Sequence, residues 1–306
     1  MRPQEVAPQD ERCNRRAEPE EPSLDLSALT KPRILPLVIF TGLPAMGMAT
    51  GGWPALPLAV TTLLGIAVAA AAANTLNMYV ERDRDALMER TRNRPLPTAE
   101  LSSGAALAFG LALAVLSTGI LWLAGGMLAA GLGVASILFY VFVYTIWLKP
   151  RSVYNAVIGG AAGAVSPLIA DAAVNGAVGA PGLLLFAIIF FWQPPHVWAI
   201  ALYRAEDYAA AGIPMMPARV GPERTRWRML WYTLGLVPVT LAPAILGLLG
   251  PLYLASAIAL DAWFVWSCVS LIRQRTDDAA RRVFQVSLAF LALLYLAMLV
   301  DLLIGG

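Results

Sequence analysis

The chain has 306 residues, of which 58% are hydrophobic and only 14% are charged, and its formal net charge is +2. This composition lies outside the range of soluble globular domains and predicts an all-α membrane protein with several spanning helices; we expect no nucleic-acid partner. Two cysteines without CxxC spacing are too few for a disulfide framework, and a single histidine excludes a multi-histidine metal centre.

The first 28 residues are rich in Pro, Glu and Arg and contain no apolar run. We expect a disordered cytoplasmic tail at 1–28 and no cleavable signal peptide, because a signal peptide needs an apolar centre of its own. The rest of the chain, 29–306, is expected to form one membrane domain.

Nine apolar segments follow the tail, each near the roughly 20 residues that a bilayer requires. They lie at about 34–52, 55–80, 101–122, 127–147, 153–175, 181–203, 229–249, 252–272 and 283–304. All 22 Lys and Arg residues lie in or near the tail and the connections after the second, fourth, sixth and eighth segments. The positive-inside rule therefore places these connections and the N-terminus in the cytoplasm, and the C-terminus outside. We expect a multi-pass protein of a bacterial-type cytoplasmic (inner) membrane.

The second segment runs into a charged stretch, NTLNMYVERDRDALMERTRNRPLP at 74–97. On a helix, Asn77, Glu81 and Asp85 share an arc about 80° wide that also contains Asn74, while Asp83 points almost the opposite way. Two carboxylates and an amide suit Mg²⁺, which takes its remaining ligands from water and substrate phosphates. The arginines that follow could neutralise such phosphates: Arg90, Arg92 and Arg94. The alternative is a solvated, charge-rich loop.

A second acidic stretch, FFWQPPHVWAIALYRAEDYAAAGIPMMP, occupies 190–217. Trp192, His196, Tyr203 and Asp207 have the spacing of one helical face. A histidine within a spanning helix is a functional candidate that could contact a metal or porphyrin or transfer a proton. It could equally be a neutral histidine that is hydrogen-bonded between helices. Glu206 and Asp207 could supply a second set of Mg²⁺ ligands, or be an exposed carboxylate pair.

Other charged residues have ordinary explanations. Lys31 and Arg33 precede the first segment, and Lys149 and Arg151 follow the fourth, where orientation and lipid anchoring would account for them. Three aspartates lie in or near spanning segments toward the opposite side, where we expect structural pairing: Asp171, Asp261 and Asp301.

Five stretches carry a resemblance to a known family: LTKPR at 29–33, NMYVERDRDALMERTRNRPLP at 77–97, LKPRSVYNAVIGGAAGAVSPL at 148–168, WQPPHVWAIALYRAEDYAAAGIPMMP at 192–217 and ARRVFQVSLAFLALLYLAMLVD at 280–301. They resemble the protohaem IX farnesyltransferases, or haem O synthases, a branch of the UbiA-type intramembrane prenyltransferases. The resemblance covers about 28–304. It implies a nine-helix bundle with a central cavity open toward the cytoplasmic face.

The resemblance also implies roles for individual residues. Asn77, Glu81 and Asp85 match the first Mg²⁺/diphosphate motif of the family, and Glu206 and Asp207 match the second. Basic positions suited to the diphosphate are matched by Arg90, Arg94 and Lys149, and His196 matches the histidine of the haem side. Further expected substrate contacts are Asn74, Tyr144, Arg151, Trp192 and Tyr203. The family more usually has Asp at the position of Glu81 and Arg at that of Pro150.

The implied reaction transfers the farnesyl group of farnesyl diphosphate to a vinyl group of protohaem IX, with addition of water, to give haem O. Mg²⁺ is the implied cofactor, and the bilayer and haem A synthase are implied partners. Two other functions stay open: prenylation of an aromatic quinone precursor, and a transporter or non-catalytic haem-binding protein.

Overall fold

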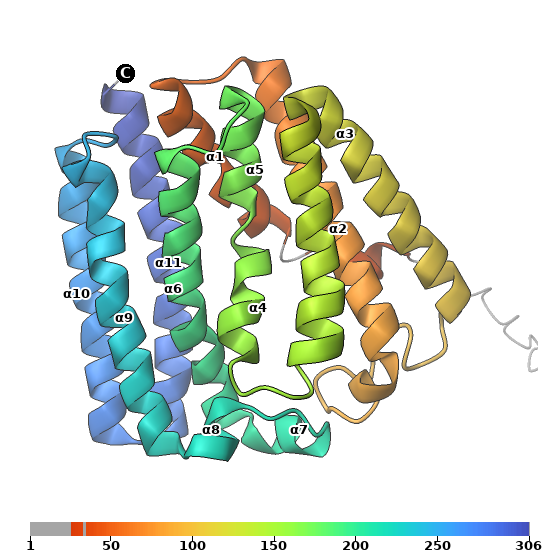
Figure 1. The fold of residues 1–306 in the computed structure, drawn as a ribbon. Helices are drawn as coiled ribbons and strands as arrows, with labels where there is room; N and C mark the ends of the chain where they lie inside the picture. The colour runs from red at the N-terminus through yellow and green to blue at the C-terminus, as the bar shows by residue number, and fades with distance from the viewer. Residues whose placement is uncertain (1–25, 33–34, 306) are drawn as a thin grey trace, which may run out of the picture.

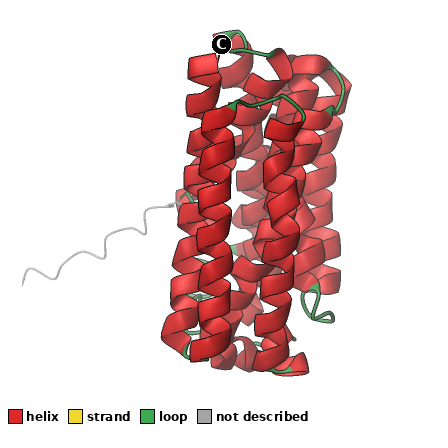
Figure 2. Ribbon diagram, turned by 90° about the vertical axis from the view of Figure 1, so that its left-hand side faces the viewer, coloured by secondary structure: helices red, strands yellow, loops and turns green. Residues whose placement is uncertain are grey.

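A computed structural model describes residues 26–32 and 35–305, so the tail predicted at 1–28 lies almost wholly outside the described residues. Every regular element in the described residues is helical, and the long helices stand side by side in one bundle (Figures 1 and 2). The all-α prediction is confirmed.

The helices follow the predicted apolar segments closely. In chain order they are η1 (Leu26–Thr30), α1 (Leu35–Thr50), α2 (Leu56–Asp85), α3 (Ser103–Leu138), η2 (Phe139–Leu148), α4 (Asn155–Gly163), α5 (Ser166–Asn175), α6 (Ala180–Tyr203), α7 (Ala205–Ala210), α8 (Met216–Val220), α9 (Pro222–Ile245), α10 (Pro251–Gln274) and α11 (Asp277–Gly305). Within the described residues, seven helical stretches are long and apolar enough to cross a membrane, and α1 is a shorter apolar helix. The chain is therefore a polytopic membrane protein.

One of the seven stretches, 103–148, contains two of the predicted spans. Its backbone leaves the helical region at Gly125 and Gly126, and Figure 1 shows the chain reversing there. Gly126 has a positive φ of 66°, and a Cβ at Gly125 would lie 2.4 Å from Cα of Ala173. A side chain at either position would be strained or would clash, so the two glycines allow this tight turn against α5. With this break and with α1, the helices are compatible with nine spans.

The two ends of the bundle differ in character. The basic connections after α2, η2, α6 and α10 lie at the end that carries α7 and α8, as Figure 1 shows. At the other end two aspartates accept hydrogen bonds from the first turns of neighbouring helices: Asp171 from the backbone N–H groups of Gly179 and Gly182 (2.7 and 3.0 Å), and Asp301 from those of Gly250 and Tyr253. These bonds satisfy donors that a helix start leaves free. Together with the bond from Thr240 to Asp261 (2.6 Å), they agree with the structural pairing expected of the three aspartates.

A π-helical segment, η2, positions one wall of the site. The Lys149 N–H donates to the carbonyl of Tyr144, five residues back, at 2.8 Å. On the neighbouring helix α4, a Cβ added at Gly159 would lie only 2.1 Å from Cδ2 of Tyr144. The missing side chain at Gly159 therefore lets α4 pack directly on the tyrosine ring and fixes the end of η2.

Candidate active site

The first acidic motif forms a buried stripe on the last turns of α2. The helix continues five residues beyond the predicted span to Asp85, because nothing between 80 and 85 breaks it. Asn77, Glu81 and Asp85 are 2%, 3% and 4% exposed, whereas Asp83 on the opposite face has an 86% exposed side chain. Within the stripe, Nδ2 of Asn77 donates to Oε2 of Glu81 at 2.9 Å. The spacing of four residues thus brings the polar groups together inside the bundle.

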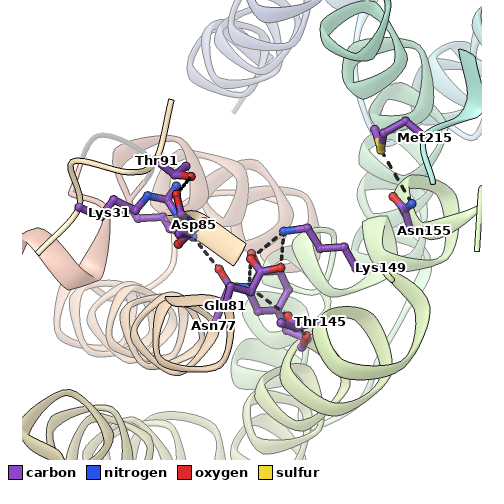
Figure 3. A network of polar contacts seen from close by, with 11 residues as sticks. Lys31, Asn77, Glu81, Asp85, Thr91, Thr145, Lys149, Asn155 and Met215 are labelled. Carbon is purple, nitrogen blue, oxygen red and sulfur yellow. Dashed lines mark hydrogen bonds and ion pairs between the residues drawn. The ribbon is translucent and has the colours of Figure 1, made fainter. Parts of the chain in front are cut away.

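The end of η2 supplies the partners of Glu81. Nζ of Lys149 lies 2.5 and 2.6 Å from the two carboxylate oxygens of Glu81, and the hydroxyl of Thr145 accepts from Nδ2 of Asn77 at 3.1 Å. Figure 3 shows these groups converging from α2 and η2. Tyr144 lies beside them, with Nζ of Lys149 5.9 Å from the centre of its ring.

Two more cations complete the cluster. Nη1 of Arg94 lies 2.7 Å from Oδ2 of Asp85, and Nζ of Lys31 donates to Oδ1 of Asn77 at 3.0 Å. Lys31 follows η1, which is held against α2 by the bond from Nδ2 of Asn74 to the carbonyl of Thr30 (3.2 Å). Burial, followed by the nearby charges of Arg94 and Lys149, lowers the pKa of Lys31 from 10.5 to about 7. A bound anion would oppose this shift and keep the ammonium charged.

We call Lys31, Asn77, Glu81, Asp85, Arg94 and Lys149 the charge cluster. It lies next to a cavity of about 240 Å³, whose wall includes Lys31 of the cluster and the neighbouring Asn74. The remaining cavity wall consists mainly of small and apolar residues of α1, α2, α4 and α5, together with four polar residues: Ser136, Tyr140, Ser166 and Gln193. An elongated apolar group with a charged head would place its head on the cluster and its chain in the cavity.

The second acidic motif lies beyond the end of α6. The helical face predicted from Trp192 to Asp207 is interrupted at Arg204, which leaves helical geometry (φ −120°, ψ 28°) before α7 begins. Oδ1 of Asp207 accepts from the N–H of Glu89 at 3.2 Å, and this bond ties α7 to the loop after α2. Glu206, Asp207 and Tyr203 line a second cavity of about 420 Å³.

His196 lies between α6 and α11. Its Nδ1 is 2.7 Å from the Ser287 hydroxyl, and its ring stacks on Trp192 at 4.4 Å and lies 4.8 Å from Phe284. Trp192 in turn donates to the carbonyl of Ser287 at 2.7 Å. Tyr203 continues this face: its ring is 6.5 Å from that of Phe284 and 5.2 Å from the Arg281 guanidinium.

Not every predicted residue joins the charge cluster. Arg151 is exposed and donates to the carbonyls of Ile146 and Trp147, so it caps η2. Arg90 is exposed on the loop after α2. Lys31, in contrast, was explained from sequence by lipid anchoring, yet it contacts Asn77; its place in the LTKPR stretch was the available signal. Arg33 lies outside the described residues.

The residues present fit a hard divalent cation. Among the residues that the structure describes, Oδ2 of Asp207 is buried without a hydrogen-bond partner, and Oε1 of Glu81 is buried with no partner other than the Lys149 ammonium. Within residues 26–32 and 35–305, no three Asp, Glu, His or Cys side chains gather into a ready-made metal site. A metal held by the acidic motifs would therefore complete its coordination shell with water and phosphate oxygens, as Mg²⁺ usually does in proteins.

Comparison with known proteins identifies the family and the fold. The sequence profile of the UbiA prenyltransferase family matches residues 38–294. A protoheme IX farnesyltransferase from Acidiphilium cryptum is 49% identical over 286 residues, 90% of each chain, and one from Symbiobacterium thermophilum is 46% identical over 279 residues, 90% of this chain and 93% of the relative. Among solved structures, that of a digeranylgeranylglyceryl phosphate synthase superposes with a TM-score of 0.77 at 17% identity, covering 90% of this chain and 97% of that one. That of an Archaeoglobus fulgidus UbiA homolog bound to DMAPP and Mg²⁺ superposes with a TM-score of 0.63 at 21% identity, covering 89% and 98%. The structural likenesses establish the fold.

Proposed function

The chain belongs to the UbiA prenyltransferase family, and we propose that it transfers the farnesyl group of farnesyl diphosphate to a vinyl group of protohaem IX. Water adds in the same reaction, so the products are haem O and diphosphate. The relatives with 44–49% identity are named for this reaction. The observation that carries the proposal is the buried charge cluster beside a cavity walled by small apolar residues.

Asn77, Glu81 and Asp85 would hold one Mg²⁺, and Glu206 and Asp207 a second. When bound, Mg²⁺ supplies charge neutralisation to the diphosphate as the bond from its oxygen to C1 of the farnesyl group breaks. The two stretches are already joined through the Glu89–Asp207 hydrogen bond (3.2 Å), which supports their acting on one diphosphate.

The cations of the chain bind and orient the same leaving group. In the absence of substrate, Arg94 and Lys149 neutralise Asp85 and Glu81, and Lys31 donates a hydrogen bond to Asn77. Substrate binding exchanges these partners: the cations turn to phosphate oxygens, and the acidic groups are freed for the metal. Arg90, on the same loop, adds a further positive charge at the mouth. Because the cluster is buried, these charges act in a water-poor site, where they stabilise the departing diphosphate more strongly than in water.

The reacting carbons then lie in the cavity. Its apolar wall excludes bulk water from the allylic cation that forms at C1. Asn74 lines the cavity and the Tyr144 ring lies beside Lys149 of the charge cluster, so both would lie near C1. The terminal carbon of the vinyl group attacks C1, and water completes the side chain.

For the haem side we propose the face of α6 that packs on α11. The Nδ1 contact with Ser287 fixes the orientation of the His196 ring and leaves Nε2 as the nitrogen for haem. Trp192 and Tyr203 would contribute flat aromatic surface, and Arg281, stacked on Tyr203, lies where it could meet a carboxylate of the porphyrin.

The proposed setting is the bacterial inner membrane, with the N-terminus and the charge cluster at the cytoplasmic end and the C-terminus outside. Residues 29–306 would form the catalytic domain and 1–28 a tail. Haem A synthase is a proposed partner, since it would consume haem O.

The direct test incubates the purified protein with protohaem, farnesyl diphosphate and Mg²⁺ and measures the mass of the extracted haem. A gain of one farnesyl group plus one water supports the proposal. A prenylated aromatic product would instead favour quinone biosynthesis, and intact farnesyl diphosphate would favour a transporter or haem-binding protein.

The residues are tested by substitution. Asp85→Ala and Asp207→Ala should each abolish turnover without preventing membrane insertion. Asp83→Ala is the matched control, because that side chain is exposed on the opposite face of α2 and pairs with the neighbouring Arg82 (3.8 Å). Full activity in both test variants would refute the two-site arrangement.

A further inference from the structure

The side-chain amide of Gln193 lies in the wall of the cavity of about 240 Å³. The reaction described so far gives this amide no role. Gln193 follows Trp192 on α6, but it lines the cavity while Trp192 packs toward α11. Its Oε1 atom is buried, and no donor among the residues described by the structure reaches it. Buried acceptors are nearly always paired, so an unpaired one in a cavity indicates a missing partner.

The neighbouring glycines keep the space at this amide open. A Cβ added at Gly160 would lie 2.8 Å from Oε1 of Gln193, whereas one at Gly163 would lie 3.5 Å away, an ordinary contact distance. Gly160 is therefore the position where any side chain would push the amide aside. Because the glycines of α4 have no side chains, the Gln193 amide has room in the cavity wall.

The missing partner of Oε1 must be a hydrogen-bond donor, because an amide oxygen can only accept. The two serine hydroxyls of the cavity already donate elsewhere, Ser136 to the carbonyl of Gly133 (2.8 Å) and Ser166 to that of Val38 (2.9 Å). A prenyl chain has no donor at all. A water molecule has two O–H donors, so it can donate to Oε1 and also to a lone pair of a serine oxygen. Water therefore suits this polar part of an otherwise apolar cavity.

We propose that Gln193 binds and orients the water molecule that adds to the prenylated haem side chain. This rests on the farnesyl-transfer function proposed above. The terminal vinyl carbon bonds to C1 of the farnesyl group as the C1–O bond to diphosphate breaks, and a cation is left on the vinyl carbon next to the porphyrin ring. The water oxygen donates an electron pair to this carbon, and its surplus proton goes to the released diphosphate. Oε1 of Gln193 accepts a hydrogen bond from the water, and this orients the water so that a lone pair of its oxygen points toward the cation.

A cation without a placed water has another outcome. It can lose a proton from the adjacent carbon to the same diphosphate, which gives an alkene lighter than haem O by one water. Gln193 would therefore determine which product forms, while the charge cluster determines whether farnesyl diphosphate is consumed. The ratio of the two products separates the two roles, and a purely structural role for Gln193 would leave this ratio unchanged.

The test compares Gln193→Met, which keeps the length of the side chain and removes its hydrogen bonding, with the wild-type protein under the direct assay. The ratio of dehydrated to hydrated prenyl-haem should rise about tenfold, as expected for the loss of one hydrogen bond of about 1.4 kcal/mol. Gly160→Ala should raise the ratio in the same direction by displacing the amide, and Asp83→Ala, on the exposed face of α2, should leave it at the wild-type value. Because the clash at Gly160 is with the mobile end of a side chain, that variant should fold even if Gln193→Met does not.

The outcomes are distinct. If the wild-type protein forms no prenylated haem, the farnesyl-transfer function fails. If it does and neither Gln193→Met nor Gly160→Ala changes the product ratio, the role of Gln193 is refuted. Loss of all farnesyl transfer in both variants would also refute it, since water addition follows carbon–carbon bond formation.

Discussion

The ion pair between Lys149 and Glu81 allows a quantitative test of the charge cluster. The two side chains are 19% and 4% exposed, and Nζ lies 2.5 and 2.6 Å from the carboxylate oxygens. Lys149→Met removes the cation and leaves the carboxylate with one hydrogen bond, from Asn77. Breaking one side of a buried pair costs about 3–5 kcal/mol, and the remaining bond and partial exposure favour the lower end, about 3 kcal/mol.

A double-mutant cycle isolates the pair. Glu81→Gln combined with Lys149→Met removes both charges, so we expect the double variant to be more stable than Lys149→Met and the coupling energy to be about 2–3 kcal/mol. Unfolding would be followed by tryptophan fluorescence during titration of sodium dodecyl sulfate into mixed micelles. Arg151→Met is the control, because that exposed guanidinium only caps η2, and it should cost less than about 1 kcal/mol. Wild-type stability in Lys149→Met, or a double variant no more stable than it, would refute the reasoning.

Three further predictions follow from other contacts. Gly159→Ala would force a methyl group to within 2.1 Å of the Tyr144 ring, so it should lower the free energy of unfolding by about 1–3 kcal/mol and reduce farnesyl transfer in the same membranes; an unchanged melting temperature would contradict the close packing of α4 on η2. Asp301→Ala leaves two backbone donors of α10 without an acceptor and should cost about 2–3 kcal/mol, partly recovered by Asp301→Asn, with kcat of the remaining folded protein unaffected; a kcat loss would mean that this end of the bundle acts on the site. Chelation by EDTA should stop farnesyl diphosphate consumption, and Mg²⁺ should restore it, whereas turnover that persists after exhaustive chelation would exclude the metal.

Local periodicity accounts for the parts of the site that were predictable. The apolar runs placed the spans, and the four-residue spacing predicted the stripe of Asn77, Glu81 and Asp85, because both depend on neighbours within one helix. Two of the three cations that contact the stripe come from far along the chain. Lys31 is 46 residues from Asn77, and Lys149 is 68 from Glu81, and no single-sequence pattern reports such pairings.

Two backbone features also escaped prediction. The π-helical geometry of η2 changes the direction of Thr145 and Lys149 relative to an α-helix, and the sequence FYVFVYTIWL has no marker for it. On α6, the spacing grouped Trp192 with His196, but a helical face does not reveal which neighbour it meets. That neighbour is α11. The adjacent Gln193, which the sequence patterns did not single out, is the α6 residue that lies in the cavity wall.

The cap that Asp301 provides has a bearing on how the protein is made. Its carboxylate accepts from the first turn of α10, which precedes it by about fifty residues, so the start of α10 stays incomplete until residue 301 has been synthesised. Asp171, by contrast, precedes the start of α6 that it caps, and is ready when α6 is inserted. The α5–α6 pair can therefore form its cap as soon as α6 is inserted, whereas the α10–α11 pair must wait until Asp301 has been added. A ribosome stalled shortly before codon 301 would leave a last hairpin with unpaired backbone donors at the membrane, a form that a quality-control protease could distinguish from the finished bundle.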